Sequence, residues 1–131
     1  MKITQTLLDK LTDQAKASPR LRMNLDLRNS PADLSQRMLN AIEPGSPLPI
    51  HRHQHSSETV VCLRGRLREV FYDDAGRVTE TIDLAPNGPV VAVSIPIGQW
   101  HTVHVQESGT VIMEVKDGPY EPLGPEDFLA P

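Results

Sequence analysis

The sequence predicts an all-β protein, a barrel or sandwich of short strands preceded by one helix. From residue 48 onward, short segments rich in Val, Ile, Thr and Leu alternate with Gly, Pro, Asn and Asp, and such turn signals at roughly 8–12-residue spacing are typical of this class. The long crossover helices of a parallel α/β fold are missing. With 131 residues, 38% of them hydrophobic, the chain is expected to form one domain with a modest core.

The N-terminal part predicts a helix and then a strand. Residues 4–17 carry apolar side chains at helical spacing, Thr4 is a suitable N-cap, and Ser18-Pro19 ends the pattern. Residues 31–42 fit either a helix or an extended segment, and we favour a strand for the part from 37 to 42.

The strands expected after this point cover residues 48–53, 58–64, 66–73, 77–84, 90–95, 101–106 and 110–116. The Asp-Asp-Ala-Gly run at 73–76 joins two of them into a hairpin. Residues 118–131 contain many prolines and predict an extended strap, with Tyr120 and Phe128 as its anchors. The single domain, 1–131, thus divides into a helical extension (1–36), a β-barrel (37–117) and a tail (118–131).

The composition argues against several classes of partner. A net charge of -4 and a pI of about 5.7 do not suggest nucleic acid. No stretch approaches the ~18 apolar residues of a membrane span, and acids lie where a signal peptide has its apolar core. Cys62 is the single cysteine, which excludes an intramolecular disulfide, and it is expected to be buried and inert. We therefore expect a cytoplasmic location without membrane partners.

All histidines lie in two short segments, residues 51–55 and 101–104. Residues two apart on a strand share a face, with Cα atoms ~6.5–7 Å apart. His51 and His53 can therefore bind one metal ion together. Glu58 has the wrong parity for an uninterrupted strand, but it joins them if residues 54–57 form a turn and Glu58 opens a returning antiparallel strand. His101 would arrive from a distant strand after a Pro-Ile-Gly turn.

Three imidazole nitrogens and one carboxylate oxygen suit a divalent transition metal: Zn, Fe, Ni, Mn, Co or Cu. Six-coordination would leave two positions for water or substrate, whereas a four-coordinate zinc would be closed and could be structural. His55 is expected at the rim or beside a ligating imidazole. His104 should face the opposite way from His101. Glu114 interrupts an apolar run, so it is either buried with a partner, such as an arginine or a ligating histidine, or solvated.

These residues resemble the motifs of the cupin superfamily. The first motif is matched at every position, by Gly45, His51, His53, Glu58 and Gly65. The second is matched by Pro96, Gly98 and His101, whereas Val90 replaces its leading glycine and Val105 its terminal asparagine. Neither departure removes a ligand. A cupin is a double-stranded β-helix, a jelly-roll-like barrel, and the resemblance implies that fold here.

A narrower resemblance, to the WbuC-type cupin fold metalloproteins, covers most of the chain. It rests on Arg37 to Asn40, on His51-Arg52-His53 with Glu58-Thr59, on residues 98–103 and on residues 114–120. That bacterial family, some of whose members are linked to surface-polysaccharide gene clusters, implies His51, His53, Glu58 and His101 as metal ligands. Dimerisation is likewise an expectation from the family.

The sequence thus favours a metal-binding cupin that acts on a small molecule, with a sugar or sugar nucleotide suggested by the family alone. If it is an enzyme, it would be a metal-dependent isomerase or oxygenase, and no acid–base pair stands out. The alternative is a non-enzymatic binding module with a structural metal. A metal-free, epimerase-like barrel fits less well because that chemistry uses a His–Asp or His–Tyr pair.

Overall fold

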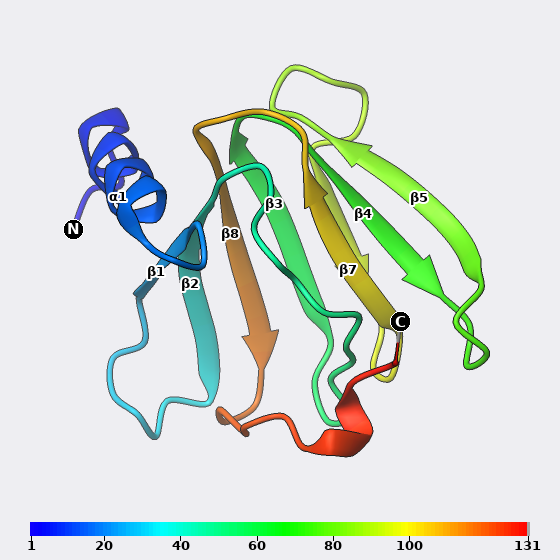
Figure 1. Ribbon diagram of the computed structural model, residues 1–131. Helices are drawn as coiled ribbons and strands as arrows, with labels where there is room; N and C mark the ends of the chain where they lie inside the picture. The colour runs from blue at the N-terminus through cyan, green and yellow to red at the C-terminus, as the bar shows by residue number, and fades with distance from the viewer. Residues whose placement is uncertain (131) are drawn as a thin grey trace.

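Two antiparallel sheets face each other, and one helix lies outside the larger sheet (Figure 1). The computed structural model describes residues 1–130. Its elements are α1 (Gln5–Ala17), β1 (Arg22–Asp26), β2 (Ser35–Ile42), β3 (Glu58–Arg64), β4 (Leu67–Tyr72), β5 (Val78–Leu84), β6 (Ala92–Ile95), β7 (Trp100–Val105), β8 (Thr110–Asp117) and the 3-10 turn η1 (Pro125–Asp127). The all-β prediction is confirmed.

The larger sheet has the order β1-β2-β8-β3-β6, and the smaller has the order β5-β4-β7. Side chains alternate between the two faces of each strand, so the larger sheet packs on both sides. Its inner face and the smaller sheet enclose one core: Ile42, Val60, Cys62, Leu67, Phe71, Leu84, Ile95 and Ile112. Cys62 is buried there, as expected.

The outer face of the larger sheet packs against α1. Leu8, Leu11 and Ala15 of the helix contact Leu39 and Val111 of β2 and β8. The helix begins as expected, because the Thr4 hydroxyl accepts a hydrogen bond of 3.2 Å from the Leu7 amide. Among the described residues, no helix is both long and apolar enough to cross a membrane.

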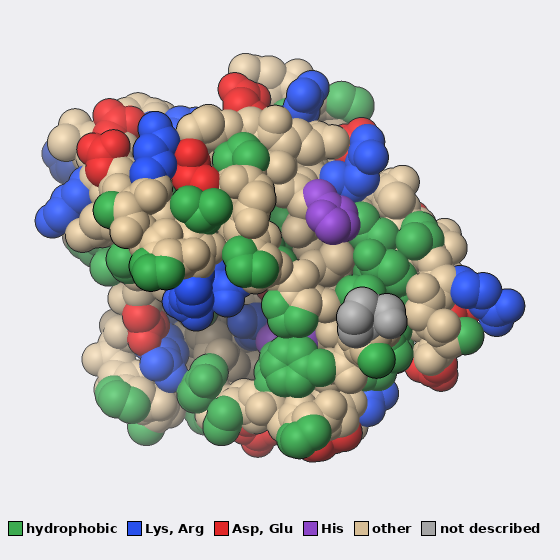
Figure 2. Space-filling view, viewed as in Figure 1, with side chains coloured by type: hydrophobic (Ala, Val, Ile, Leu, Met, Phe, Trp, Pro, Cys, Tyr) green, Lys and Arg blue, Asp and Glu red, His purple; other side chains and the backbone are tan. Residues whose placement is uncertain are grey.

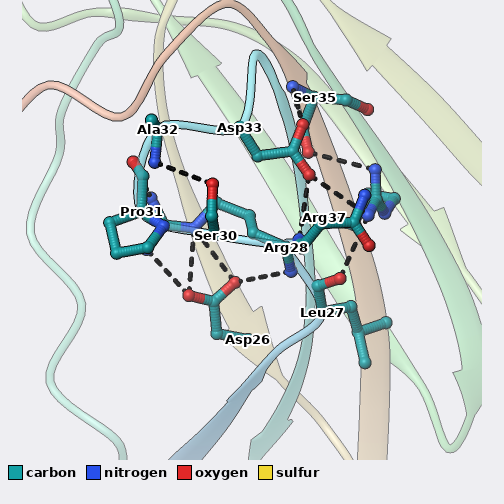
Figure 3. A network of polar contacts seen from close by, with 10 residues as sticks. Asp26, Leu27, Arg28, Ser30, Pro31, Ala32, Asp33, Ser35 and Arg37 are labelled. Carbon is teal, nitrogen blue, oxygen red and sulfur yellow. Dashed lines mark hydrogen bonds and ion pairs between the residues drawn. The ribbon is translucent and has the colours of Figure 1, made fainter.

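β1 was not expected from the sequence, whereas the strand favoured over 37–42 is confirmed and begins at Ser35. β1 and β2 form an antiparallel pair. Ion pairs hold the loop between them: Asp26 with Arg28 at 2.7 Å and Asp33 with Arg37 at 3.4 Å (Figure 3).

The strand expected over 48–53 is wrong. Only His51 pairs there, in isolated bridges to His101 and to Phe128. Pro47 and Pro49 have no amide hydrogen, which prevents a continuous ladder. The segment is nevertheless extended and lies between β7 and the C-terminal tail.

The tail crosses the end of the barrel near the start of β7 (Figure 1), but its anchors differ from those expected. Tyr120 and Phe128 are 59% and 43% exposed, whereas Asp127 is 7% exposed. The Asp127 carboxylate accepts hydrogen bonds from the Gln54 side chain and the Gly124 amide. The strap is therefore held by polar contacts and by backbone hydrogen bonds to residues 50–52.

Candidate metal centre

Four side chains from three parts of the chain converge at the end of the barrel that the tail crosses. His51 and His53 come from the extended segment, Glu58 is the first residue of β3, and His101 lies in β7. One ring nitrogen from each histidine can be chosen so that all three lie within 4.8 Å of one another. The structure therefore brings together the four residues that the sequence singled out.

Glu58 places a carboxylate oxygen beside two of these imidazoles. Its Oε2 lies 3.3 Å from His53 Nε2 and 3.5 Å from His101 Nε2, and this buried oxygen has no hydrogen-bond partner within residues 1–130. Two ligand atoms bonded at ~2.1 Å to one tetrahedral ion are about 3.4 Å apart. These distances fit a shared cation better than a direct hydrogen bond.

Backbone carbonyls orient two of the imidazoles. His51 Nδ1 lies 3.0 Å from the Pro49 carbonyl oxygen, and His101 Nδ1 lies 2.9 Å from that of Gln99. A carbonyl only accepts, so each Nδ1–H donates. Each Nε2 is then left with the lone pair that a metal ion requires.

The titration behaviour of the site also suits a cation. Burial opposes ionisation of Glu58, but the imidazoles of His101 and His53 and the charge of Lys116 hold its pKa well below the usual range. Burial and the nearby charge of His101 lower the pKa of His51 to about 4. Burial opposes the protonation of His101, but the contact with Glu58 raises its pKa. A metal ion would replace that proton as the partner of the Glu58 anion.

The fold resembles those of solved cupins. KdgF from a Halomonas species aligns with a TM-score of 0.61 and 12% identity, over 79% of this chain and 84% of its own. Oxalate decarboxylase from Bacillus subtilis, whose Mn(II) centres have been studied, aligns at 0.58 and 19%, over 77% of this chain and 26% of its own. A cupin 2 domain-containing protein from Halorhodospira halophila aligns at 0.55 and 22%, over 73% and 63%.

The chain thus spans about a quarter of oxalate decarboxylase and most of KdgF. At such low identities the likeness establishes the fold, a cupin jelly roll. No curated protein sequence matches the chain.

A family model matches residues 3–84, more than half of the chain, and is described as Domain of unknown function (DUF6016). The chain belongs to this family. The match includes His51, His53 and Glu58 and ends before His101, so the DUF6016 region supplies three of the four convergent residues. The cupin fold and the cluster of three histidines in this DUF6016 member together fit a cupin that binds a divalent metal ion.

The other residues that the sequence of this DUF6016 member singled out lie at different places in the structure. His55 is exposed on the loop before β3, and His104 is exposed on β7. Glu114 lies on β8 and lines a cavity of about 40 Å³ together with His51 and His101. Burial and then the charge of Glu58 raise the pKa of Glu114 to about 7. The alternative in which it faces the interior is therefore the one observed.

Sequence reasoning missed two polar residues that line the same 40 Å³ cavity, Glu69 on β4 and Asn40 on β2. Both carboxylate oxygens of Glu69 and the Asn40 Oδ1 lack a hydrogen-bond partner among the described residues. A signal for Glu69 existed, because it has the same parity as the apolar Leu67 and Phe71 and so had to face inward.

Proposed function

We propose that this protein is a metal-dependent cupin of the WbuC type, with one divalent transition metal bound by His51, His53, Glu58 and His101. The observation that carries the proposal is the position of Glu58 Oε2. This oxygen is buried, lies close to two imidazole nitrogens and has no hydrogen-bond partner in the part of the chain that the structure describes. A bound ion would act as a Lewis acid or bind substrate through open coordination positions. The chain's own residues would hold and orient it.

We further propose a small-molecule substrate, a sugar or sugar nucleotide. A hollow of about 490 Å³ opens beside the centre and includes His53 and His55 in its lining, and this volume is typical of small-molecule sites. We refer to it as the outer hollow. A purely structural ion would need no such space beside it, so the hollow favours catalysis or ligand binding over the structural alternative.

The test is metal content combined with one matched pair of variants. Elemental analysis of protein purified without added metal should find close to one transition metal per chain. His101→Ala should lower metal affinity by more than about 100-fold, since it removes a ligand, whereas His104→Ala should leave affinity unchanged because His104 is exposed on the opposite face of β7.

Calorimetric titration of the metal-free variants measures this difference. A protein that contains no metal and binds none on addition would overturn the proposal. Equal losses in the two variants would show that His101 is not a ligand. A fully coordinated ion without exchangeable water would favour the structural role.

A further inference from the structure

The inner face of the larger sheet changes from apolar to polar along its strands. Residues directly opposite each other in antiparallel strands share a face. Ile112 of β8 lies opposite Cys62, in the core. Towards the metal centre, Lys116 of β8 lies opposite Gln36 of β2 and Glu58 of β3, and these three residues form a polar row, or rung, across the same face. A jelly roll normally fills this face with apolar side chains, so the polar rung requires an explanation.

The polar face forms one wall of the outer hollow. Gln36 of β2 and Lys116 of β8 contribute to it. Arg22 and Asn24 of β1 also contribute, from positions opposite Ile42 and Asn40 of β2. The C-terminal tail, including Tyr120, and the side chains of His53 and His55 also line the outer hollow. On the face drawn in Figure 2, Lys or Arg and histidine side chains lie at the back of a hollow.

The two cations of this wall, Arg22 and Lys116, differ from most arginines of the protein in their distance from carboxylates. Arg28 and Arg37, for example, are paired with carboxylates (Figure 3). Among the described residues, no carboxylate oxygen lies within 4.0 Å of the charged groups of Arg22 or Lys116, and both side chains are only partly exposed. Arg22 Nη1 donates to the Pro47 carbonyl oxygen at 3.0 Å, which leaves its other donors available.

The acids that line the outer hollow do not neutralise these cations. Asp117 accepts hydrogen bonds from the amide and hydroxyl of Ser57, and Asp127 is held by Gln54 and Gly124. The other two, Glu121 and Glu126, are exposed. Lys116 acts electrostatically on Glu58 and Glu114, and Glu114 also acts on Arg22. Among the described residues, however, neither carboxylate approaches Arg22 or Lys116 to within 4.0 Å.

We propose that the outer hollow binds a small hydroxyl-bearing anion, with its carboxylate or phosphate held by Arg22 and Lys116 and its other end directed at the metal centre. Gln36 Nε2 already donates to the Gly118 and Pro119 carbonyl oxygens, so Gln36 would accept from a ligand hydroxyl through its Oε1. The Asn24 amide would bond to another hydroxyl, and the guanidinium of Arg22 suits a bidentate oxyanion. This inference rests on the proposed function, because it takes the metal centre as the place where the ligand reacts.

The test compares three probes that share one ring: glucose, glucuronate and glucose 6-phosphate. Binding is measured by calorimetry on metal-loaded protein whose metal content is verified by elemental analysis. At least one of the two anions should bind about 10-fold or more tightly than glucose, since hydrogen bonds to charged groups are the stronger ones. The anion that gains identifies a carboxylate or a phosphate as the recognised group.

Variants assign the effect to the two cations. Lys116→Gln and Arg22→Gln should each lose most of the preference for the anion, and Lys116→Arg should keep part of it. Arg66→Gln is the matched control because Arg66 is exposed and lies outside the outer hollow. Circular dichroism and the metal content confirm that each variant is folded and loaded.

The inference is overturned if glucose binds as tightly as both anions, if neither anion binds, or if Arg66→Gln loses as much as Lys116→Gln. These outcomes are distinct from failure of the proposed function. That failure is a chain that takes up no metal, and it is detected before any probe is added.

Discussion

Glu69 combines complete burial with a lack of hydrogen-bond partners. Its exposed fraction is 0%, and both carboxylate oxygens are unpaired among the described residues. Burial raises its pKa from 4.5 to about 8. Between these two values the folded chain holds a proton that the unfolded chain has released. The contribution of Glu69 to stability is therefore fully present below pH 4.5 and is lost as the pH rises towards 8.

We expect Glu69→Gln to remove this pH dependence. In metal-free protein, the free energy of unfolding of the wild type should fall relative to the variant by on the order of 4 kcal/mol between pH 4.5 and pH 8. Denaturant unfolding across this range measures the difference. Glu80→Gln, at an exposed site on β5, should run parallel to the wild type. Parallel curves for Glu69→Gln as well would mean that Glu69 is ionised in the folded state.

At the scale of elements, the turn between β3 and β4 depends on the absence of a side chain at Gly65. This residue has φ +85°, and a Cβ added to it would lie 2.6 Å from the Thr110 Cα. Gly109 has nearly the same backbone, φ +84°, but no heavy atom lies within 4 Å of its Cβ position. Substitution of Gly109 therefore tests backbone strain alone, whereas substitution of Gly65 tests backbone strain together with a steric clash.

Gly109→Ala should cost about 1–2 kcal/mol of stability, the penalty of a left-handed conformation. Gly65→Ala should cost at least about 2 kcal/mol more, because the backbone at Thr110 must also move. Thermal and denaturant unfolding of the two variants measure the difference. Equal losses of stability in the two variants would show that the β8 backbone can move at Thr110 without strain.

The segment that carries His51 and His53 is held as an element by its neighbours. His51 exchanges two backbone hydrogen bonds with His101, of 3.0 and 2.9 Å. The Arg52 guanidinium lies 4.4 Å from the Trp100 ring centroid and donates to the Glu126 carbonyl oxygen. Arg52 thus points away from the two histidines and ties their segment to both β7 and the tail, which keeps the imidazoles in place.

At the scale of the whole molecule, a bound ion would connect the two sheets. Glu58 belongs to the larger sheet and His101 to the smaller. Because an ion bound by both favours the folded state alone, it should stabilise the protein by about 2.7 kcal/mol at a free concentration of 100 Kd.

Chelation should therefore lower the Tm of the loaded protein by roughly 10 °C, a shift in keeping with this energy for a chain of this size. Differential scanning calorimetry before and after verified metal removal measures the shift. His101→Ala, treated in the same way, should show a much smaller change. An unchanged Tm in the wild type would mean that no ion links the sheets.

Sequence reasoning succeeded where a feature depends on neighbouring residues. The Thr4 cap and most of the strands follow from local pattern, and the spacing of the histidines pointed to one site. It failed where distant partners decide. β1 is a strand because β2 lies beside it, whereas 48–53 is not one because only His51 forms bridges there, to the distant residues His101 and Phe128.

The sequence by itself therefore determined the β class, the helix and the residues suited to a metal, since strand alternation and side-chain chemistry are local properties. Only the tertiary structure decided which residues face one another. It paired β3 with β6 and β8 rather than with the histidine segment, and it enclosed Glu69 in the cavity that His51 and His101 also line. Among the described residues, it also left no carboxylate oxygen within 4.0 Å of the charged groups of Arg22 or Lys116. Such contacts join residues far apart in the chain, and they exist only once the sheets have closed on each other.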